Sequence, residues 1–120
     1  MTPTSQFVFK IAHREEWAEA LRRGSYGGSR DDLRDGFIHL SAFRQLAGTL
    51  AKHFCGQEDL VLIKLDMRVL GSELRWEPSR GGDLFPHLHG DLPVAAAREV
   101  YALALGENGI PALPKEVAPC

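Results

Sequence analysis

The run from Leu60 to Leu65, LVLIKL, constrains the fold more than any other stretch of the chain. All of its residues except Lys64 are apolar. A strand with one face in water alternates apolar and polar side chains, so an almost continuous apolar run indicates a strand that is covered on both faces. We therefore expect one central strand with structure packed against each side of its sheet, and Asp66 should close it.

Other elements are predicted around this strand. The clearest amphipathic pattern runs from Phe43 to Phe54, where apolar residues recur at helical spacing, with Ser41 expected to cap that helix and Gly56 to end it. We expect a helix over 14–23, strands over 7–11, 37–40, 74–77 and 84–88, and a turn followed by a strand after residue 92. Pro86 should place its strand at an edge or bend.

Two segments are predicted to lack regular structure. Residues 24–34 are rich in glycine and polar side chains, which favours a mobile loop in which Tyr26 is the apolar residue. The proline-containing tail, residues 106–120, is expected to lie along the surface or fray. At 120 residues the chain has the length of one domain, with a core over about 7–105.

Composition excludes several classes of protein. Sixteen acidic and fourteen basic residues give a net charge of -2, so no overall field favours nucleic acid, although a local basic patch is compatible with this balance. No apolar stretch approaches the roughly 20 residues that span a bilayer, and the N-terminus lacks a signal-peptide pattern. Cys55 and Cys120 show neither metal-ligand spacing nor a disulfide framework, which favours a reduced, cytoplasmic setting.

His39 is the first candidate for chemistry. It interrupts a short apolar strand and stands directly before the helix that Ser41 is expected to cap. A ligand at this junction would meet both an imidazole and helix amides, a geometry that favours anions or hydroxyl groups. The alternative is a core histidine that is bonded to a backbone carbonyl.

A second group of candidates lies in the segment 74–90, LRWEPSRGGDLFPHLHG. Glu77 stands between Trp76 and a proline, so its backbone is stiff and its side chain is placed beside an aromatic wall. Burial there would raise the pKa of Glu77 and suit acid, base or electrostatic work. The alternative is a solvated carboxylate that pairs with Arg75 or Arg80.

Arg80 precedes two glycines, and its guanidinium together with their open backbone would suit a phosphate or carboxylate. A plain surface turn explains the same residues equally well. The glycine pair is not a phosphate-loop motif, because the strand, spacing and lysine of that motif are absent.

The histidines also raise a rival hypothesis, a metal-dependent hydrolase. His87 and His89 share one face of an extended segment, and either His39 or His53 would supply a third nitrogen. Against this, no carboxylate lies at a recognised ligand spacing, and His53 falls in the last turn of a helix, where a cation is favoured anyway. We therefore expect no metal.

Four segments together carry a resemblance to a known family: DGFIHLS at 35–41, DLVLIKLD at 59–66, LRWEPSRGGDLFPHLHG at 74–90 and LPV at 92–94. Over about residues 7–105 the chain resembles a bacterial family known as domain of unknown function 952. The resemblance implies a compact α+β fold similar to that of ADP-ribosyltransferases, with two small mixed sheets and packed helices around a nucleotide cleft.

The resemblance also implies a ligand. In the wider ADP-ribosyltransferase superfamily a strand histidine, followed two positions later by serine or threonine, helps hold the ribose and nicotinamide of NAD. His39 and Ser41 resemble this pair, although Leu40 stands where many members have glycine. The implied ligand is therefore NAD or a related nucleotide, in a cleft between the FIHLS segment, 37–41, and the WEPSRGG segment, 76–82.

These observations define the candidate site. The candidate ligand-binding residues are His39, Ser41, Trp76, Arg80 and His87, and the candidate catalytic residues are His39 and Glu77. An active enzyme would transfer ADP-ribose through an oxocarbenium-like state that a carboxylate stabilises. The alternatives left open are a non-catalytic ligand-binding module of the same fold and the histidine-metal hydrolase.

Overall fold

The described residues form short strands and helices, with the α-helices between β1 and β5 and mainly strands after β5. The computed structural model describes residues 6–117, except for the side chain of Arg80. The strands are β1 (Phe7–His13), β2 (Ser25–Tyr26), β3 (Ile38–His39), β4 (Leu60–Asp66), β5 (Leu74–Pro78), β6 (Leu84–Leu88), β7 (Leu92–Pro93), β8 (Ala97–Leu105) and β9 (Pro111–Ala112). The helices are α1 (Arg14–Arg23), α2 (Arg30–Asp35), α3 (Leu46–His53) and α4 (Met67–Leu70). None of these helices is long and apolar enough to cross a membrane.

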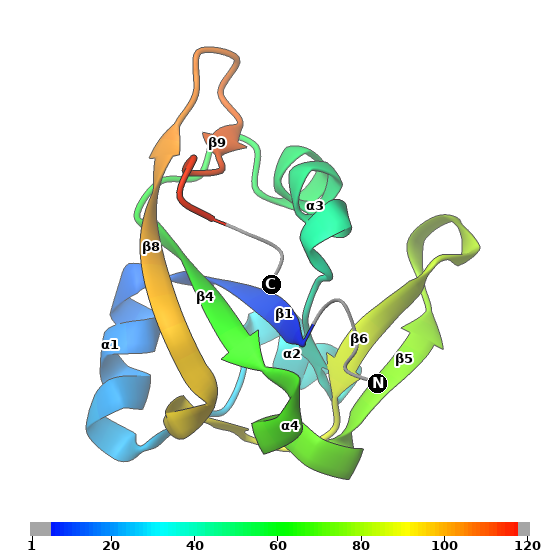
Figure 1. The fold of residues 1–120 in the computed structure, drawn as a ribbon. Coiled ribbons are helices and arrows are strands. Elements are labelled where there is room, and N and C mark those ends of the chain that lie inside the picture. The colour runs from blue at the N-terminus through cyan, green and yellow to red at the C-terminus, as the bar shows by residue number, and fades with distance from the viewer. Residues whose placement is uncertain (1–5, 118–120) are drawn as a thin grey trace.

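The described strands form three antiparallel groups. The largest has the order β1-β4-β8-β9, a second has the order β3-β6-β5, and β2 pairs with β7 (Figure 1). The α+β class is confirmed. The sheets differ in detail from the two mixed sheets that the family resemblance implied, because every pair is antiparallel and β2–β7 forms a separate short ribbon.

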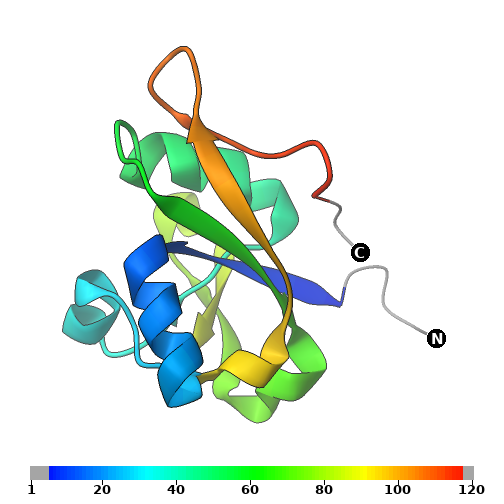
Figure 2. The ribbon, with the colours of Figure 1, turned by 90° about the vertical axis from the view of Figure 1, so that its left-hand side faces the viewer.

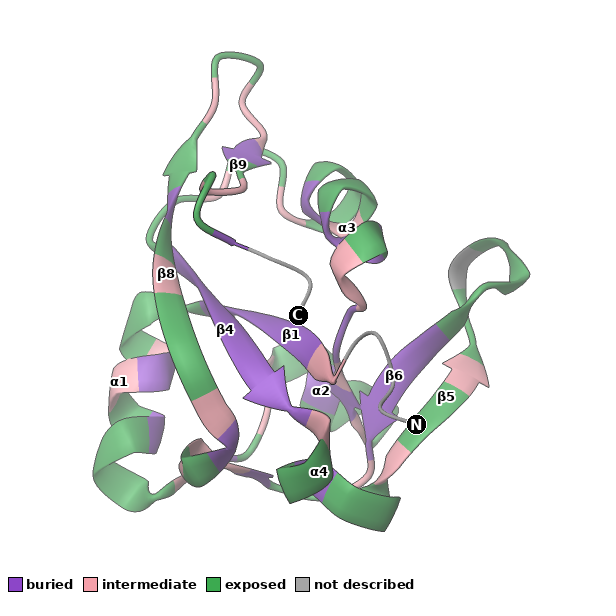
Figure 3. Cartoon of the chain, viewed as in Figure 1, coloured by how far each residue is buried: buried purple, intermediate pink, exposed green. Residues whose placement is uncertain are grey.

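The central strand expected from the apolar run is β4. It pairs with β1 on one side and β8 on the other, and all of its residues are buried (Figure 3). Val61, Ile63 and Leu65 belong to a core cluster shared with α1, β3 and β6. Leu60 and Leu62 belong to a second cluster, shared with α3 and the C-terminal segment. The prediction of a strand covered on both faces is therefore confirmed.

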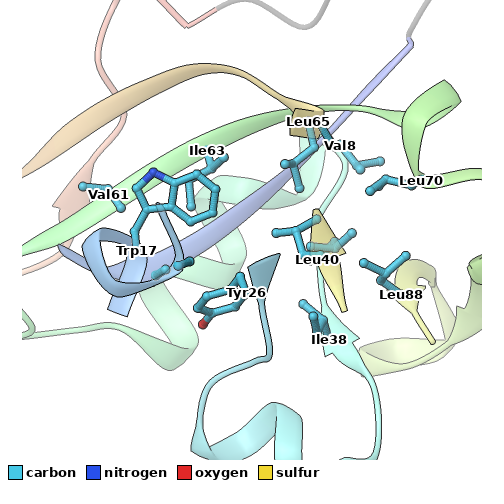
Figure 4. Packing of buried hydrophobic residues seen from close by; sticks show 14 residues of the cluster. Val8, Trp17, Tyr26, Ile38, Leu40, Val61, Ile63, Leu65, Leu70 and Leu88 are labelled. Atoms are coloured by element: carbon cyan, nitrogen blue, oxygen red, sulfur yellow. The ribbon is translucent and has the colours of Figure 1, made fainter. Parts of the chain in front are cut away.

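Helix α1 covers one face of this sheet (Figure 2). It ends before Gly24, whose φ of 92° is the left-handed conformation that favours glycine at a helix end. Trp17 is buried and lies among Val61 and Ile63 in the close view (Figure 4). The prediction of a helix over 14–23 is confirmed.

The prediction of a mobile loop over 24–34 is wrong. These residues contain β2, in which Tyr26 is buried, and most of α2. Helix α2 has six residues and therefore makes fewer than two turns, too few to produce a periodic apolar stripe. Ser29 marks its start by accepting a hydrogen bond from the amide of Asp32 at 3.2 Å.

Ser41 does not cap the following helix. Its backbone is extended and exchanges two hydrogen bonds with Phe9 of β1, at 2.8 and 2.9 Å. The chain turns instead at the 3-10 segment Phe43–Gln45, where the Gln45 side chain accepts from the amide of Ala42 at 2.9 Å. Helix α3 then ends at His53 and not at Gly56.

Pro86 lies in the central strand of its sheet and not at an edge. Its carbonyl accepts a hydrogen bond from the amide of Leu40 at 3.0 Å. Proline has no N–H with which to return a second bond, so the pairing of β3 stops at His39. A proline is accommodated in this central strand because its neighbour is only two residues long.

The C-terminal segment contributes to the core instead of only lying along the surface. Pro111 and Ala112 form β9, which pairs with the end of β8. Val117 is buried in the cluster that packs between the sheet and α3. The pairing of β9 brings this segment back across the face of the sheet that α1 does not cover (Figure 1).

The two-sided burial of β4 predicts where apolar side chains matter for stability. Leu62→Ala should lower the free energy of unfolding by about 2–5 kcal/mol, because the side chain is fully buried and its loss leaves a cavity. Leu21→Ala makes the same change at an exposed position of α1 and should cost no more than about 0.5 kcal/mol. Urea unfolding of both variants measures the difference, and equal losses would contradict a core on both faces of β4.

Candidate functional site

The carboxylate of Asp32 is the polar centre of the candidate site. Its Oδ1 accepts a hydrogen bond from the amide of His39 at 3.0 Å and lies 2.7 Å from Nδ1 of the same residue. Its Oδ2 accepts from Nζ of Lys10 at 2.8 Å and from the amide of Ser29 at 2.9 Å. Asp32 is only 2% exposed, so this buried carboxylate is satisfied by four donors from three segments.

Local sequence places Asp32 at this point. Ser29 and Asp32 form a capping box, in which each side chain accepts a hydrogen bond from the other residue's amide. Gly28 makes the close approach possible: its φ is 115°, and a Cβ at this position would lie 2.8 Å from Cβ of Asp32. A larger residue at position 28 would therefore push α2 away from β3.

The pKa of Asp32 is well below its ordinary value. Burial alone would raise it, but the hydrogen bond from His39 and the ammonium of Lys10 outweigh burial. The carboxylate is therefore ionised at neutral pH and can only accept hydrogen bonds. It follows that Nδ1 of His39 carries a proton and donates it in their 2.7 Å contact.

The imidazole of His39 is held from both sides. Its Nε2 lies 3.0 Å from Oδ2 of Asp35, at the last position of α2. The backbone carbonyl of His39 accepts a hydrogen bond from Nζ of Lys10 at 3.1 Å. The side chain is nevertheless 37% exposed. The sequence left open a core histidine bonded to a backbone carbonyl, but the partners of this imidazole are carboxylates.

A pocket of about 260 Å³ opens beside this group. His39 and Ser41 both line it, because residues two apart on an extended segment face the same side. Helix α3 forms part of the opposite wall, where Oγ1 of Thr49 lies 3.4 Å from Oγ of Ser41. Lys10 and Asp32 supply charge, and Phe85 supplies an apolar surface.

A second polar cluster is centred on Glu77. Its Oε1 accepts hydrogen bonds from Nε2 of His89 and Nδ1 of His87, both at 2.8 Å. These bonds hold the pKa of Glu77 below its ordinary value, which is the opposite of the rise expected from burial. The carboxylate is paired, as the alternative supposed, and its partners among the described side chains are the two histidines.

The ring of Phe37 lies between the two clusters. Its centroid is 4.1 Å from that of His87 in a stacked arrangement, 4.7 Å from that of His39 and 5.3 Å from that of His89. The three histidines therefore surround one aromatic ring. Among the described residues, no group of three or more His, Cys, Asp or Glu is arranged to hold a metal ion.

The structure brings only part of the predicted site together. His39 and Ser41 line the pocket, whereas Glu77, Trp76 and His87 do not. Trp76 is 42% exposed on β5, and His87 is buried in the Glu77 cluster. Arg80 lies in the 3-10 segment Arg80–Gly82, and its side chain is outside the described part of the structure. Ser79 of the WEPSRGG segment does line the pocket, but α2 and α3 supply more of its lining residues.

Sequence analysis missed the residues that hold His39. Lys10 was detectable as a lone cation inside the apolar run FVFKIA, because a buried lysine needs a partner. Asp32 was detectable from the spacing Ser29-x-x-Asp32, which is that of a capping box. Both signals were present, but the glycine-rich composition around residue 28 favoured a loop.

The fold and the pocket define an α+β domain with a polar, carboxylate-anchored histidine at the mouth of a small pocket. Residues 11–100 match the family described as "Protein of unknown function (DUF952)", and the chain belongs to this family.

The chain is also similar to solved structures of one protein. The crystal structure of protein CC0527 from Caulobacter crescentus has a TM-score of 0.85 and 45% identity, covering 88% of this chain and 93% of that one. Its solution NMR structure has a TM-score of 0.83 and 44% identity, covering 94% and 97%. Both were structural genomics targets. No curated protein matches the chain.

The buried pair of Asp32 and Lys10 predicts a large cost of neutralising one partner. Asp32→Asn should lower the free energy of unfolding at pH 7 by about 3 kcal/mol, because it leaves the ammonium of Lys10 buried without its counter-charge. Asp31→Asn is the matched control. Its carboxylate is 70% exposed and pairs with Arg34 at 3.3 Å, so its loss should cost less than about 1 kcal/mol.

Comparing the wild-type protein with Asp32→Asn also tests the pKa of Asp32. A carboxyl whose pKa is lower in the folded than in the unfolded state contributes its full stabilisation at pH values above the pKa of the unfolded state. This contribution is lost as the pH falls from there through the pKa of the folded state. The stability difference between wild type and Asp32→Asn should therefore be constant from pH 7 to 5 and shrink below about pH 4. Urea unfolding across this range measures it, and a difference that widens in acid would contradict the assignment.

Proposed function

We propose that this protein binds NAD or a related nucleotide in the pocket beside His39, and that its fold is related to that of the ADP-ribosyltransferases. The observation that carries the proposal is the shared position of His39 and Ser41 on one wall of one pocket. These residues resemble the histidine and hydroxyl residue that hold the ribose and nicotinamide of NAD in that superfamily. In this proposal Ser41 and His39 contact the hydroxyl groups of a ribose, and Nε2 of His39 exchanges its contact with Asp35 for one with the ligand.

The chemistry of the pocket supports a ribose. Hydroxyl groups of Ser29, Ser41 and Thr49 line it, together with the imidazole of His39. Each hydroxyl both donates and accepts, which suits a sugar that presents several hydroxyl groups. Phe54 and Phe85 add aromatic surface against which a planar ring can pack.

The size of the pocket limits how much of the ligand it holds. Pockets for whole drug-sized ligands usually measure about 300–1,000 Å³, and this one measures about 260 Å³. One ribose with its attached ring therefore fits the interior better than a complete dinucleotide. The remainder of NAD would extend over the rim, towards Arg34.

The proposal is one of binding and does not require turnover. Glu77 remains a prediction as the catalytic carboxylate, but it does not line the pocket and is held by His87 and His89. These contacts favour the non-catalytic module among the alternatives. Measuring nicotinamide release after incubation with NAD distinguishes an enzyme from a binding module, because a transferase or glycohydrolase releases nicotinamide and a binding module does not.

Thermal unfolding with NAD, ADP-ribose and nicotinamide tests the proposal. NAD should raise the midpoint temperature in a concentration-dependent way, since a ligand at a hundred times its dissociation constant adds about 2.7 kcal/mol of stability. The increase should be smaller in Ser41→Ala, which keeps the backbone pairing to Phe9, and absent in His39→Ala. His13→Ala, at an exposed position, should bind like wild type. No stabilisation by any of the three compounds, or equal stabilisation of His39→Ala, would refute the proposal.

A further inference from the structure

The strand β5 forms an open edge of its sheet. Among the described strands it pairs only with β6, and it is the outer strand of the order β3-β6-β5 (Figure 1). Arg75, Trp76 and Pro78 of this strand are exposed (Figure 3). An open edge presents backbone N–H and C=O groups to any strand that can lie beside it, so a second chain can dock here.

The hydrogen bonds of β6 show which groups of β5 face this open edge. The carbonyl of Pro86 points towards β3, where it accepts a hydrogen bond from the amide of Leu40 at 3.0 Å. The N–H and C=O groups of one residue in an antiparallel strand point to the same side, and those of the next residue point to the other side. Trp76 lies opposite Pro86, so these two residues do not exchange hydrogen bonds. The N–H and C=O groups of Trp76 are therefore directed away from β6, towards the open edge.

The sequence of β5, LRWEP, is complementary to itself around Trp76. When two copies of the strand pair antiparallel about a two-fold axis at this residue, Trp76 faces its own copy and the two exchange a pair of backbone hydrogen bonds. Arg75 of each copy then lies directly opposite Glu77 of the other copy. Opposite charges at directly opposed positions of two strands stabilise the pairing.

The same charges exclude the neighbouring registers. Moving the axis by one residue towards the N-terminus places Arg75 opposite its own copy, and moving it by one residue towards the C-terminus places Glu77 opposite its own copy. Like charges at opposed positions are destabilising. Pro78 has no N–H and therefore ends the ladder. Charges and prolines protect an edge from unspecific pairing, and those of β5 leave the register centred on Trp76 open.

The side chains of this edge are available for such a contact. Both histidines that hold Glu77 donate to its Oε1, so its Oε2 can accept a hydrogen bond from a guanidinium. Trp76 is 42% exposed and Leu84 is 48% exposed. They share one face of the hairpin, because Leu84 lies opposite Pro78 and residues two apart on a strand face the same side. Covering these side chains with a second copy would remove apolar surface from water.

We propose that two copies of this chain associate by antiparallel pairing of their β5 strands about Trp76. The pairing joins the sheets of the two copies into one continuous sheet. A contact between two strands of five residues is small, so the dimer is weak and dissociates on dilution. No residue of β5 lines the pocket at His39, so this proposal does not depend on the proposed nucleotide site.

Sedimentation velocity of the intact protein, at concentrations from about 10 μM to about 1 mM, tests the proposal. The wild-type protein should change from monomer to dimer as its concentration rises. Arg75→Glu should weaken association roughly tenfold or more, because it replaces both attractive charge pairs by repulsive ones. Arg14→Glu is the matched control, since it makes the same change of charge at an exposed position of α1, and it should associate as wild type does.

Trp76→Pro tests the backbone contact. Proline removes an N–H that faces the open edge and not one that is bonded to β6, so the fold should be kept and the dimer lost. Trp76→Thr keeps this N–H and removes the indole. It should associate more weakly than wild type and more strongly than Trp76→Pro. Far-UV circular dichroism of each variant checks that the fold is retained.

Isotope-filtered NMR of a mixture of labelled and unlabelled wild-type protein locates the contact. Intermolecular signals should connect Leu74 of one copy with Pro78 of the other, because these residues are opposed in the proposed register. A wild-type protein that stays monomeric up to about 1 mM would overturn the proposal, even if β5 then pairs with an unrelated extended peptide. Equal association of Arg75→Glu and wild type, or intermolecular signals that do not involve β5, would overturn it as well.

Discussion

The buried carboxylate of Asp32 joins three segments that are distant in the sequence. It pairs with Lys10 of β1, belongs to α2, and holds both the backbone amide and the imidazole of His39 in β3. A buried ion pair contributes little net stability when it is complete, but a lone buried charge is costly. The position of α2, and with it the wall of the pocket, therefore depends on this carboxylate remaining ionised and fully paired.

The fold was predictable where the pattern is local. The apolar run of β4 indicated a strand buried on both faces, and the helical pattern ending at Gly24 gave α1. Helix α2 and the two-residue strands β2, β7 and β9 were missed, because elements this short leave no periodic signal, whereas β3 lies within the strand predicted over 37–40. Ser41 was misassigned because a serine before a helix fits a cap as well as it fits the bridge to Phe9 that it forms.

The candidate site was predictable only in part. His39 and Ser41 were found because they are close in sequence and face one side of an extended segment. Lys10 and Asp32, which hold His39 in place, were not found, since these two residues lie 22 positions apart and only the fold brings them together. The environment of Glu77 was equally hidden, because burial and hydrogen bonding shift the pKa of a carboxyl in opposite directions and composition does not decide between them.

The central claim is that Asp32 fixes the imidazole of His39 at the mouth of the pocket. Long-range ¹H–¹⁵N NMR of the histidine side chains tests it directly, because it reports which ring nitrogen carries a proton. Nδ1 of His39 should be protonated at neutral pH in the wild-type protein, since it donates to an ionised carboxylate 2.7 Å away. A deprotonated Nδ1 would contradict the claim, because two acceptors would then face each other across this contact.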